Sequence, residues 1–264
     1  MPEPFAQTLV ETRGHSRLVR WSVFGLGLLL LAYTVVRAVT VSFTWDESWT
    51  FLHHVLRNVF YQRTYDAMGA NHHLLNVWGM WLSWKLFGDG TLALRLPNLL
   101  AHVIYLYASG RIALKARSGF LAIAVFLVLN VHPYLLDFFS LGRGYGLACG
   151  WMMLALWHAW RYLEEGRQQR DVLWASICGS LAAMSNLIMI DLLLGLGLAF
   201  LILWLLEGRR MGAAWWKRSM LTLCLPGLAG LGLILPEAMG LLHGGSLYFG
   251  SPSFWPGTLL SLGE

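Results

Sequence analysis

The chain has 264 residues, of which 57% are hydrophobic and only 12% are charged, and its mean hydropathy is +0.56. Soluble domains carry about 25% charged residues, so this composition excludes an ordinary soluble protein and indicates a polytopic membrane protein. The formal net charge of +5 does not indicate nucleic acid binding, because the basic residues form short clusters between apolar runs, where topology signals lie. The three cysteines fall within apolar runs and form no CxxC motif, so neither a disulfide framework nor a zinc site is indicated.

Several apolar runs are long enough to cross a bilayer, which takes about 20 residues. They lie at 21–41, 92–110, 118–136, 144–160, 172–187, 188–206 and 219–240. The first run lacks a small-residue cleavage site, so we expect an uncleaved span and not a signal peptide. A further run at 73–87 would reach only about 22 Å as a helix, short of a hydrocarbon core about 30 Å thick. It is also rich in tryptophan, which prefers the interface.

The charge distribution favours a surface position for 73–87. With that run on the surface, most of the 19 Lys and Arg residues fall on one side, as the positive-inside rule requires. They are Arg13, Arg17, Arg20, Arg111, Lys115, Arg117, Arg161, Arg167, Arg170, Arg209, Arg210, Lys217 and Arg218. The sequence therefore predicts an all-α transmembrane helix bundle of about seven spans, with a cytoplasmic N-terminus and an external C-terminus. We expect residues 1–264 to form a single transmembrane domain.

The first external loop, 42–91, is predicted to contain two interfacial helices. Apolar residues recur at helical spacing in the first of them, at Trp45, Trp49, Leu52, Leu56 and Val59. Such an amphipathic helix lies on a membrane surface. In the second, one face collects four small or polar residues, namely His72, Asn76, Gly79 and Ser83.

Under this topology the chemically useful residues gather on the external side. Arg95 and Arg143 stand close to apolar runs, where a charge is costly, so each needs an anionic partner. The candidates are Asp46, Glu47, Asp137 or a ligand phosphate. A structural alternative exists for the acidic pair, because Thr44-x-x-Glu47 is a capping box and Asp46 would be favoured in the first helical turn.

Other motifs also keep two interpretations. The pairs His53-His54 and His72-His73 are either metal ligands or interfacial histidines that face water. Arg143-Gly144-Tyr145 is either a binding element or a helix start with an interfacial anchor. No P-loop, GxGxxG, GxSxG or HExxH motif occurs, so nucleotide hydrolysis, Rossmann cofactors, serine hydrolysis and zinc proteolysis lose their usual support. A divalent metal is compatible with the sequence but not supported by it, and no other cofactor is indicated.

The order of these elements resembles the N-terminal half of a GT-C superfamily membrane glycosyltransferase. The branch that it resembles most contains the protein-mannosyltransferase-like and aminoarabinose-transferase-like enzymes, which use polyprenyl-phosphate sugar donors. The most specific stretch is Phe87-Gly88 followed by Ala93-Leu94-Arg95-Leu96-Pro97. The resemblance covers about residues 20–160, and residues 161–264 follow only by hydropathy. Because family members are longer, we expect this second part to be incomplete relative to the family.

The resemblance implies a role for six residues. Asp46 matches the family's first-loop acid, which acts as a catalytic base or orients the acceptor, and Glu47 is its partner. His72, Arg95, Arg143 and Tyr145 match residues expected to bind substrate, with Arg143 and Tyr145 at a phosphate site. One departure is Asn71-His72-His73-Leu74-Leu75, where the family often has Asp-x-His-Pro-Pro-Leu.

The function implied is transfer of a hexose or pentose from a polyprenyl-phosphate donor to a lipid, glycan or protein acceptor, with inversion. It would take place on the external face of a bacterial inner membrane, with membrane lipid but no nucleic acid as a partner. Two alternatives remain at this point, a transporter or flippase-like carrier and a non-catalytic membrane subunit.

Overall fold

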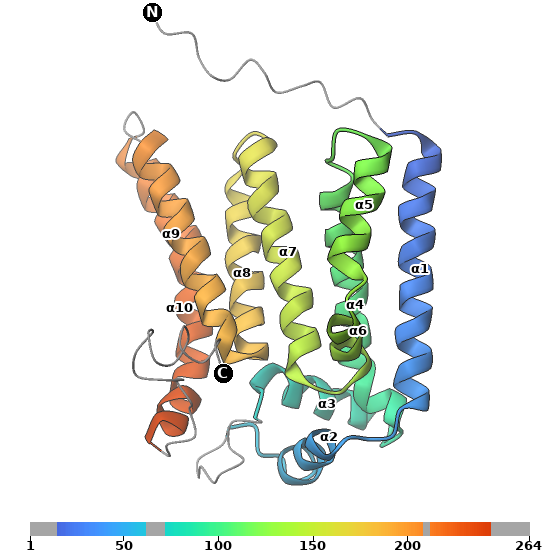
Figure 1. Ribbon diagram of the computed structural model, residues 1–264. Coiled ribbons are helices and arrows are strands. Elements are labelled where there is room, and N and C mark those ends of the chain that lie inside the picture. Colours follow the sequence, from blue (N-terminus) through green and yellow to red (C-terminus); the bar gives the residue numbers. More distant parts are fainter. Residues whose placement is uncertain (1–14, 62–71, 208–211, 244–264) are drawn as a thin grey trace, which may run out of the picture.

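The computed structural model describes residues 15–61, 72–207 and 212–243, and all regular structure within these ranges is helical (Figure 1). The α-helices are α1 (Arg17–Thr40), α2 (Trp45–Trp49), α3 (Leu74–Phe87), α4 (Thr91–Ala113), α5 (Gly119–Asn130), α6 (Pro133–Ser140), α7 (Gly144–Glu164), α8 (Gln169–Ser185), α9 (Ile190–Glu207) and α10 (Ala213–His243). A π-helix, η1 (Thr50–Val55), continues α2, and a 3-10 turn, η3 (Leu187–Met189), precedes α9.

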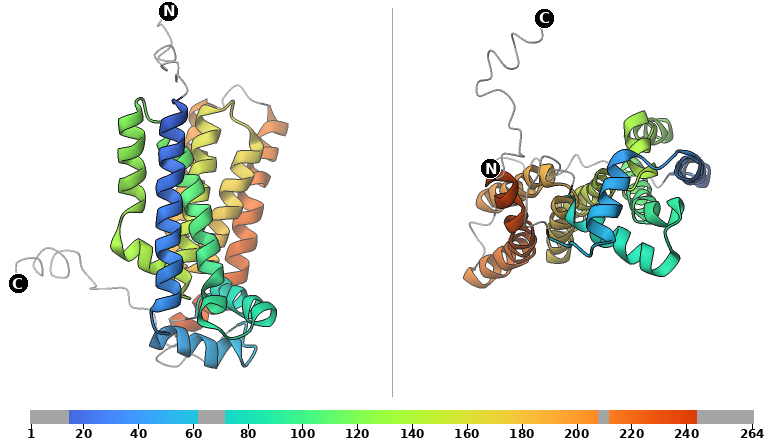
Figure 2. Two further views of the ribbon diagram at one scale, coloured as in Figure 1. Left: turned by 90° about the vertical axis from the view of Figure 1, so that its right-hand side faces the viewer. Right: turned by 90° about the horizontal axis from the view of Figure 1, so that it is seen from below.

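The long helices run side by side in an upright bundle (Figures 1 and 2). In its middle α4 packs on α7 and α7 on α8, while α1 and α5 flank α4, and α9 and α10 flank α8. Helices α2, η1 and α3 lie across one end, which we call the cap end (Figure 1). We call the opposite end the basic end, because helix termini there carry Arg20, Arg111, Arg161, Arg170 and Arg218.

Three helices of the described chain are long and apolar enough to cross a membrane: Arg17–Thr40, Leu187–Leu206 and Ala213–His243. The bent pair of α5 and α6 would make a fourth if it counts as one span. The three are the outer helices of the bundle, and many of their large side chains face outward. The inner helices bury polar groups at their contacts: Asn98 of α4 binds α3 and α7, and Asp171 of α8 binds α7. The finer expectation of seven spans stays a prediction.

The expected single span at 118–136 is broken. Helix α5 ends at Asn130, and α6 leaves it at an angle of 60°. Pro133 opens α6, and the residue before it, His132, is extended, with φ −125° and ψ 124°. A proline disfavours helical geometry in the preceding residue and cannot donate a backbone hydrogen bond, which accounts for the break.

The first expected interfacial helix is present but changes its winding. Helix α2 gives way to η1, in which Leu56 N–H donates to Phe51 O at 2.9 Å, an i→i+5 bond. Trp45, Leu52 and Leu56 are exposed, whereas Glu47 and His54 are buried against the bundle. The other two residues of the expected stripe, Trp49 and Val59, are half-buried, so the stripe is exposed only in part.

The second expected interfacial helix is α3, which covers the cap end (Figure 1). Two residues of its small and polar face, Asn76 and Ser83, are buried, as are the apolar Leu74, Val77 and Met80. A Cβ at Gly79 would lie 3.1 Å from Cβ of Pro97, so the glycine lets α3 approach α4 closely. The helix ends at Gly88, whose φ of 84° and ψ of −169° are a backbone conformation open almost only to glycine.

Glycines also allow the close packing of α7. A Cβ at Gly150 would lie 2.7 Å from the carbonyl oxygen of Ala101 in α4, and one at Gly146 would lie 2.5 Å from Phe138 O. Small residues of this kind let transmembrane helices pack backbone to backbone.

We predict that Gly150→Ala destabilises the bundle by about 1–3 kcal/mol, because the new methyl group overpacks the α4–α7 contact. Gly195→Ala is the matched control, since a Cβ at this position of α9 would meet nothing within 4 Å. We expect this control to be neutral or stabilising by up to about 1 kcal/mol, from higher helix propensity. Unfolding in mixed SDS micelles, followed by circular dichroism, measures both, and equal effects of the two substitutions would contradict the packing assignment.

Candidate functional site

The site begins where α2 starts, directly after α1. Thr44 caps this helix: its Oγ1 accepts from Glu47 N–H at 3.4 Å, and its own N–H donates to Glu47 Oε2 at 2.8 Å. The capping box predicted from Thr44-x-x-Glu47 is confirmed. It fixes the direction in which Asp46 and Glu47 leave the helix.

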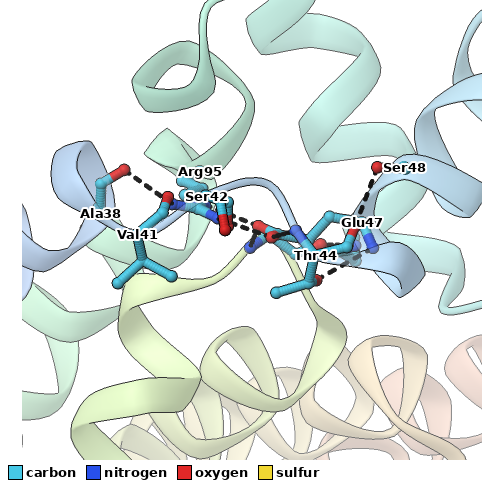
Figure 3. A network of polar contacts seen from close by, with 9 residues as sticks. Ala38, Val41, Ser42, Thr44, Glu47, Ser48 and Arg95 are labelled. Atoms are coloured by element: carbon cyan, nitrogen blue, oxygen red, sulfur yellow. Dashed lines mark hydrogen bonds and ion pairs between the residues drawn. The ribbon is translucent and has the colours of Figure 1, made fainter.

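Glu47 and Arg95 form a fully buried ion pair, which Figure 3 shows at the centre of a polar network. Arg95 Nε donates to Glu47 Oε1 and Nη2 to Oε2, both at 2.7 Å. Its remaining donors bind the backbone carbonyl oxygens of Ala38, Val41 and Ser42 at 2.8–3.0 Å. All five guanidinium N–H groups are thereby satisfied. Every donor of Arg95 binds a protein group and none is left for a ligand, as expected of an ion pair with a structural role.

Glu47 also binds the loop between α6 and α7. Gly142 N–H donates to Glu47 Oε1 at 2.6 Å, and Gly142 O accepts from Asn76 Nδ2 at 3.0 Å. Asn76 Oδ1 in turn accepts from Asn98 Nδ2 at 3.1 Å. A Cβ on residue 142 would lie 2.8 Å from Met80 Cε, so the close approach favours glycine. The network joins α2, α3, α4 and this loop.

Asp46 and Arg143 form the second ion pair of the site. Arg143 Nη1 lies 2.7 Å from Asp46 Oδ2, and the two side chains are 24% and 31% exposed. Residues 46–47 thus contact residues 142–143 twice, once through the buried Glu47 and once through Asp46. The contrast in exposure separates a buried pair that holds the fold from a pair that solvent or a ligand can reach.

Aromatic and imidazole rings surround Arg143. Its guanidinium carbon lies 5.0 Å from the ring centroid of Tyr145, a cation–π distance. Tyr145 is stacked on Phe138 and lies edge-on to His73, with centroids 4.8 and 5.5 Å apart. Gly144 makes this packing possible, because a Cβ there would lie 2.6 Å from Cγ of His73 and 2.1 Å from Ser185 O.

His72 is separate from this exposed group. Its side chain is buried, its Nδ1 contacts Glu237 Oε1 of α10, and its Nε2 lies 3.4 Å from Val59 O. His54 lies edge-on to it at a centroid distance of 4.6 Å. His72 therefore ties the start of α3 to α10.

Two ionisable groups of the cap end have shifted pKa values. Burial raises the pKa of Glu47, but hydrogen bonds from Arg95 and from the N–H groups of Gly142 and Thr44 outweigh it and hold that pKa below its ordinary value of 4.5. Burial, followed by the charges of Arg143 and His72, lowers the pKa of His73 from 6.5 to about 3. Glu47 is therefore ionised and His73 neutral at pH 7.

The six residues predicted from the sequence fall into two groups. Asp46, Arg143 and Tyr145 lie together and reach the surface, whereas Glu47, Arg95 and His72 are buried and hold neighbouring elements. His73 adjoins the exposed group instead of His72, and its Nε2 is buried without a hydrogen-bond partner among the described residues. The sequence motif His72-His73 gave no means of choosing between the two rings. Gly142 was also missed, because a backbone N–H ligand leaves no signal beyond a glycine.

Within the described ranges, no three His, Cys, Asp or Glu side chains are grouped closely enough to hold a metal ion together. Comparison with known protein families, with curated proteins and with solved structures finds no match for this chain. The resemblance to the GT-C superfamily therefore stays a prediction from the residues.

We predict that Arg95→Met lowers the free energy of unfolding by about 3–5 kcal/mol, because it leaves Glu47 buried without its cation. The double change Glu47→Leu with Arg95→Met should recover part of this loss, since it removes both charges. Recovery stays partial because the carbonyl oxygens of Ala38, Val41 and Ser42 lose their donors. The control is Arg37→Met, which breaks a half-exposed pair with Asp137 (2.7 Å) and should cost at most about 1 kcal/mol. SDS unfolding checks the series, and similar losses for Arg95→Met and Arg37→Met would rule out the structural role.

His73 should make stability depend on pH. The unfolded chain takes up a proton at this residue as the pH falls below 6.5, and the folded chain does so only near 3. Between these two pH values the unfolded chain binds more protons than the folded chain. The contribution of His73 to the free energy of unfolding is therefore fully present above pH 6.5 and is lost as the pH falls from 6.5 toward 3. The limit for one group is about 1.4 kcal/mol per pH unit, and we expect a fraction of it because His73 as a whole residue is partly exposed, although its Nε2 is buried.

Between pH 6.5 and 4.5 the free energy of unfolding should therefore fall less steeply with decreasing pH for His73→Gln than for the wild type. His132→Gln, at an exposed histidine of the same end, is the control and should keep the wild-type slope. Equal slopes for all three proteins would show that His73 is already solvated in the folded state.

Proposed function

We propose that this chain is a membrane glycosyltransferase that moves a sugar from a polyprenyl-phosphate donor to an acceptor hydroxyl. The single observation that carries the proposal is the half-exposed Asp46–Arg143 pair at the cap end, fixed from behind by the buried Glu47–Arg95 pair. The site offers a carboxylate and a guanidinium side by side. The resemblance to the GT-C superfamily supports the same assignment.

The two groups supply what the reaction needs. The Asp46 carboxylate accepts the proton of the acceptor hydroxyl, whose oxygen forms a bond to the anomeric carbon. The bond from that carbon to the phosphate oxygen breaks, and the lipid phosphate leaves with the electron pair and is stabilised by the Arg143 guanidinium. One displacement of this kind inverts the anomeric centre. Tyr145 and the neutral His73 form the wall beside the phosphate, and Glu47, Arg95 and His72 are positioning residues.

The ion pair between Asp46 and Arg143 favours a reaction in which the donor binds before the base acts. In the free site Arg143 lies 2.7 Å from Asp46. A donor phosphate competes with the carboxylate for the guanidinium, so its binding weakens the contact that occupies Asp46. The base is then available to a hydroxyl when the donor is in place, which disfavours reaction without a donor.

The location also suits a lipid donor. The exposed Trp45, Leu52 and Leu56 favour a position of α2 and η1 at the membrane surface, the depth at which a lipid phosphate lies. With the basic end cytoplasmic, by the positive-inside rule, the cap end is external, on the periplasmic face of a bacterial inner membrane. The acceptor, a lipid, glycan or protein, would then approach from outside.

The test is turnover of polyprenyl-phosphate hexoses and pentoses in proteoliposomes, measured as release of polyprenyl phosphate. We predict that Asp46→Asn lowers kcat by about 10²–10⁴-fold, since it removes the general base. Asp137→Asn is the matched control, because it changes a half-exposed acid of the same end and should leave turnover unchanged. Undiminished turnover by Asp46→Asn would exclude the base. Uptake of an intact substrate would favour a carrier, and activity that needs a co-purified protein would favour a subunit.

A further inference from the structure

A groove runs along the outside of the bundle between α1 and α4, far from the cap-end site. It encloses about 360 Å³, and its lining is apolar except at the basic end. Arg20, at the start of α1, and Arg111, near the end of α4, meet there because the two helices are antiparallel. No acidic side chain is among the described residues that line it.

The groove exists because its floor is made of small residues. Gly27 of α1 and Gly110 of α4 both face Phe126 of α5, and a Cβ on either would be 3.7 Å or less from a neighbouring side chain. Phe126 itself is buried. The walls are larger and exposed, with Phe24 and Leu28 on α1 and Tyr107 on α4. The result is a hollow that faces the surroundings of the bundle.

Its dimensions fit one lipid chain. From Arg20 to Leu31 the groove follows α1 for 11 residues, about 16 Å along a helix. This is about half of a hydrocarbon core about 30 Å thick, or one leaflet. A helix about 10 Å wide would occupy roughly 1,200 Å³ over that length, so the groove is too small to hold a helix of another subunit.

The charge selects the headgroup. We propose that this groove binds one anionic phospholipid from the leaflet at the basic end, with an acyl chain along Gly27 and Gly110 and the phosphate between Arg20 and Arg111. A second hollow of about 430 Å³, lined by Arg17 and Trp21, adjoins the groove at Arg20. Tryptophan favours this depth of the membrane. Arg111 also lies over Trp157, 5.3 Å from the ring centroid, which holds its guanidinium in place.

The selectivity should come from the arginines and not from the apolar walls. An acyl chain that enters the groove leaves the company of other lipid chains, which are as apolar as the groove, so its burial adds little to the binding free energy. A basic residue near an anionic membrane surface contributes about 1 kcal/mol, roughly a fivefold gain in binding. Two arginines therefore predict a preference for phosphatidylglycerol over phosphatidylcholine on the order of 25-fold.

Native mass spectrometry of the full chain, released from nanodiscs with equal amounts of the two lipids, tests the proposal. We expect one retained phosphatidylglycerol on the wild type. Arg20→Gln with Arg111→Gln should reduce the preference to nearly equal binding, and Arg20→Gln alone, which keeps the Arg111–Trp157 contact, should reduce it about fivefold. The matched control is Arg117→Gln with Arg170→Gln, which removes the same charge from exposed positions of the same end and should retain the lipid.

A variant that fills the groove distinguishes lipid binding in the groove from lipid binding to a basic surface. Val103→Trp fills the groove from its exposed α4 wall while both arginines stay, and it should abolish retention of the lipid. The proposal is overturned if the double arginine variant keeps its preference, if the control loses as much, or if Val103→Trp binds as the wild type does. A dimer or a co-purified peptide that protects the groove in place of the lipid would overturn it as well.

Discussion

The buried pair of Glu47 and Arg95 is the constraint on which the cap end depends. Each charge costs several kcal/mol to bury, and only complete hydrogen bonding repays that cost. Arg95 reaches completeness by binding three carbonyl oxygens at the end of α1 in addition to Glu47. Glu47 reaches it by accepting from Thr44 and Gly142. Three segments distant in sequence, 38–47, Arg95 and Gly142, therefore meet around one pair, and none of them can shift without leaving a buried charge unsatisfied.

The position of the exposed Asp46–Arg143 pair is set by the buried Glu47–Arg95 pair. Asp46 precedes Glu47 and Arg143 follows Gly142, so the bond from Gly142 N–H to Glu47 Oε1 sets the separation of the two backbones. The Asp46–Arg143 contact joins the same two segments one residue away from the Glu47–Gly142 bond. A partly exposed carboxylate and its cation can be held in this way without being buried themselves. It explains why two adjacent acids of similar chemistry have different surroundings and suit different roles.

Local patterns predicted the local structure well. The Thr44–Glu47 box depends on residues three apart and is confirmed. Trp45, Leu52 and Leu56 of the expected apolar stripe are exposed, whereas its Trp49 and Val59 are half-buried. The choice of partners was not predictable in the same way. Asp46, Glu47 and Asp137 were equal candidates for Arg95 and Arg143, because partners 48 residues apart, such as Glu47 and Arg95, are brought together only by the packing of α1, α4 and α7. The break at Pro133 has a local cause, the proline itself, but a hydropathy profile does not register it. The π-helical turn after Trp49 has no pattern in the sequence that predicts it.

The two ends of the bundle differ in how charge is balanced, and this difference gives the molecule its polarity. At the cap end Arg37, Arg95 and Arg143 are each matched by one acid, Asp137, Glu47 and Asp46. At the basic end the acids Glu164, Glu165 and Asp171 share Lys115 and Arg161, and further arginines line the helix termini. The positive-inside rule counts Lys and Arg and gives acids little weight. The excess of arginine, and not the ion pairs, is therefore what makes the basic end the expected cytoplasmic one, and it also suits this end to anionic lipid.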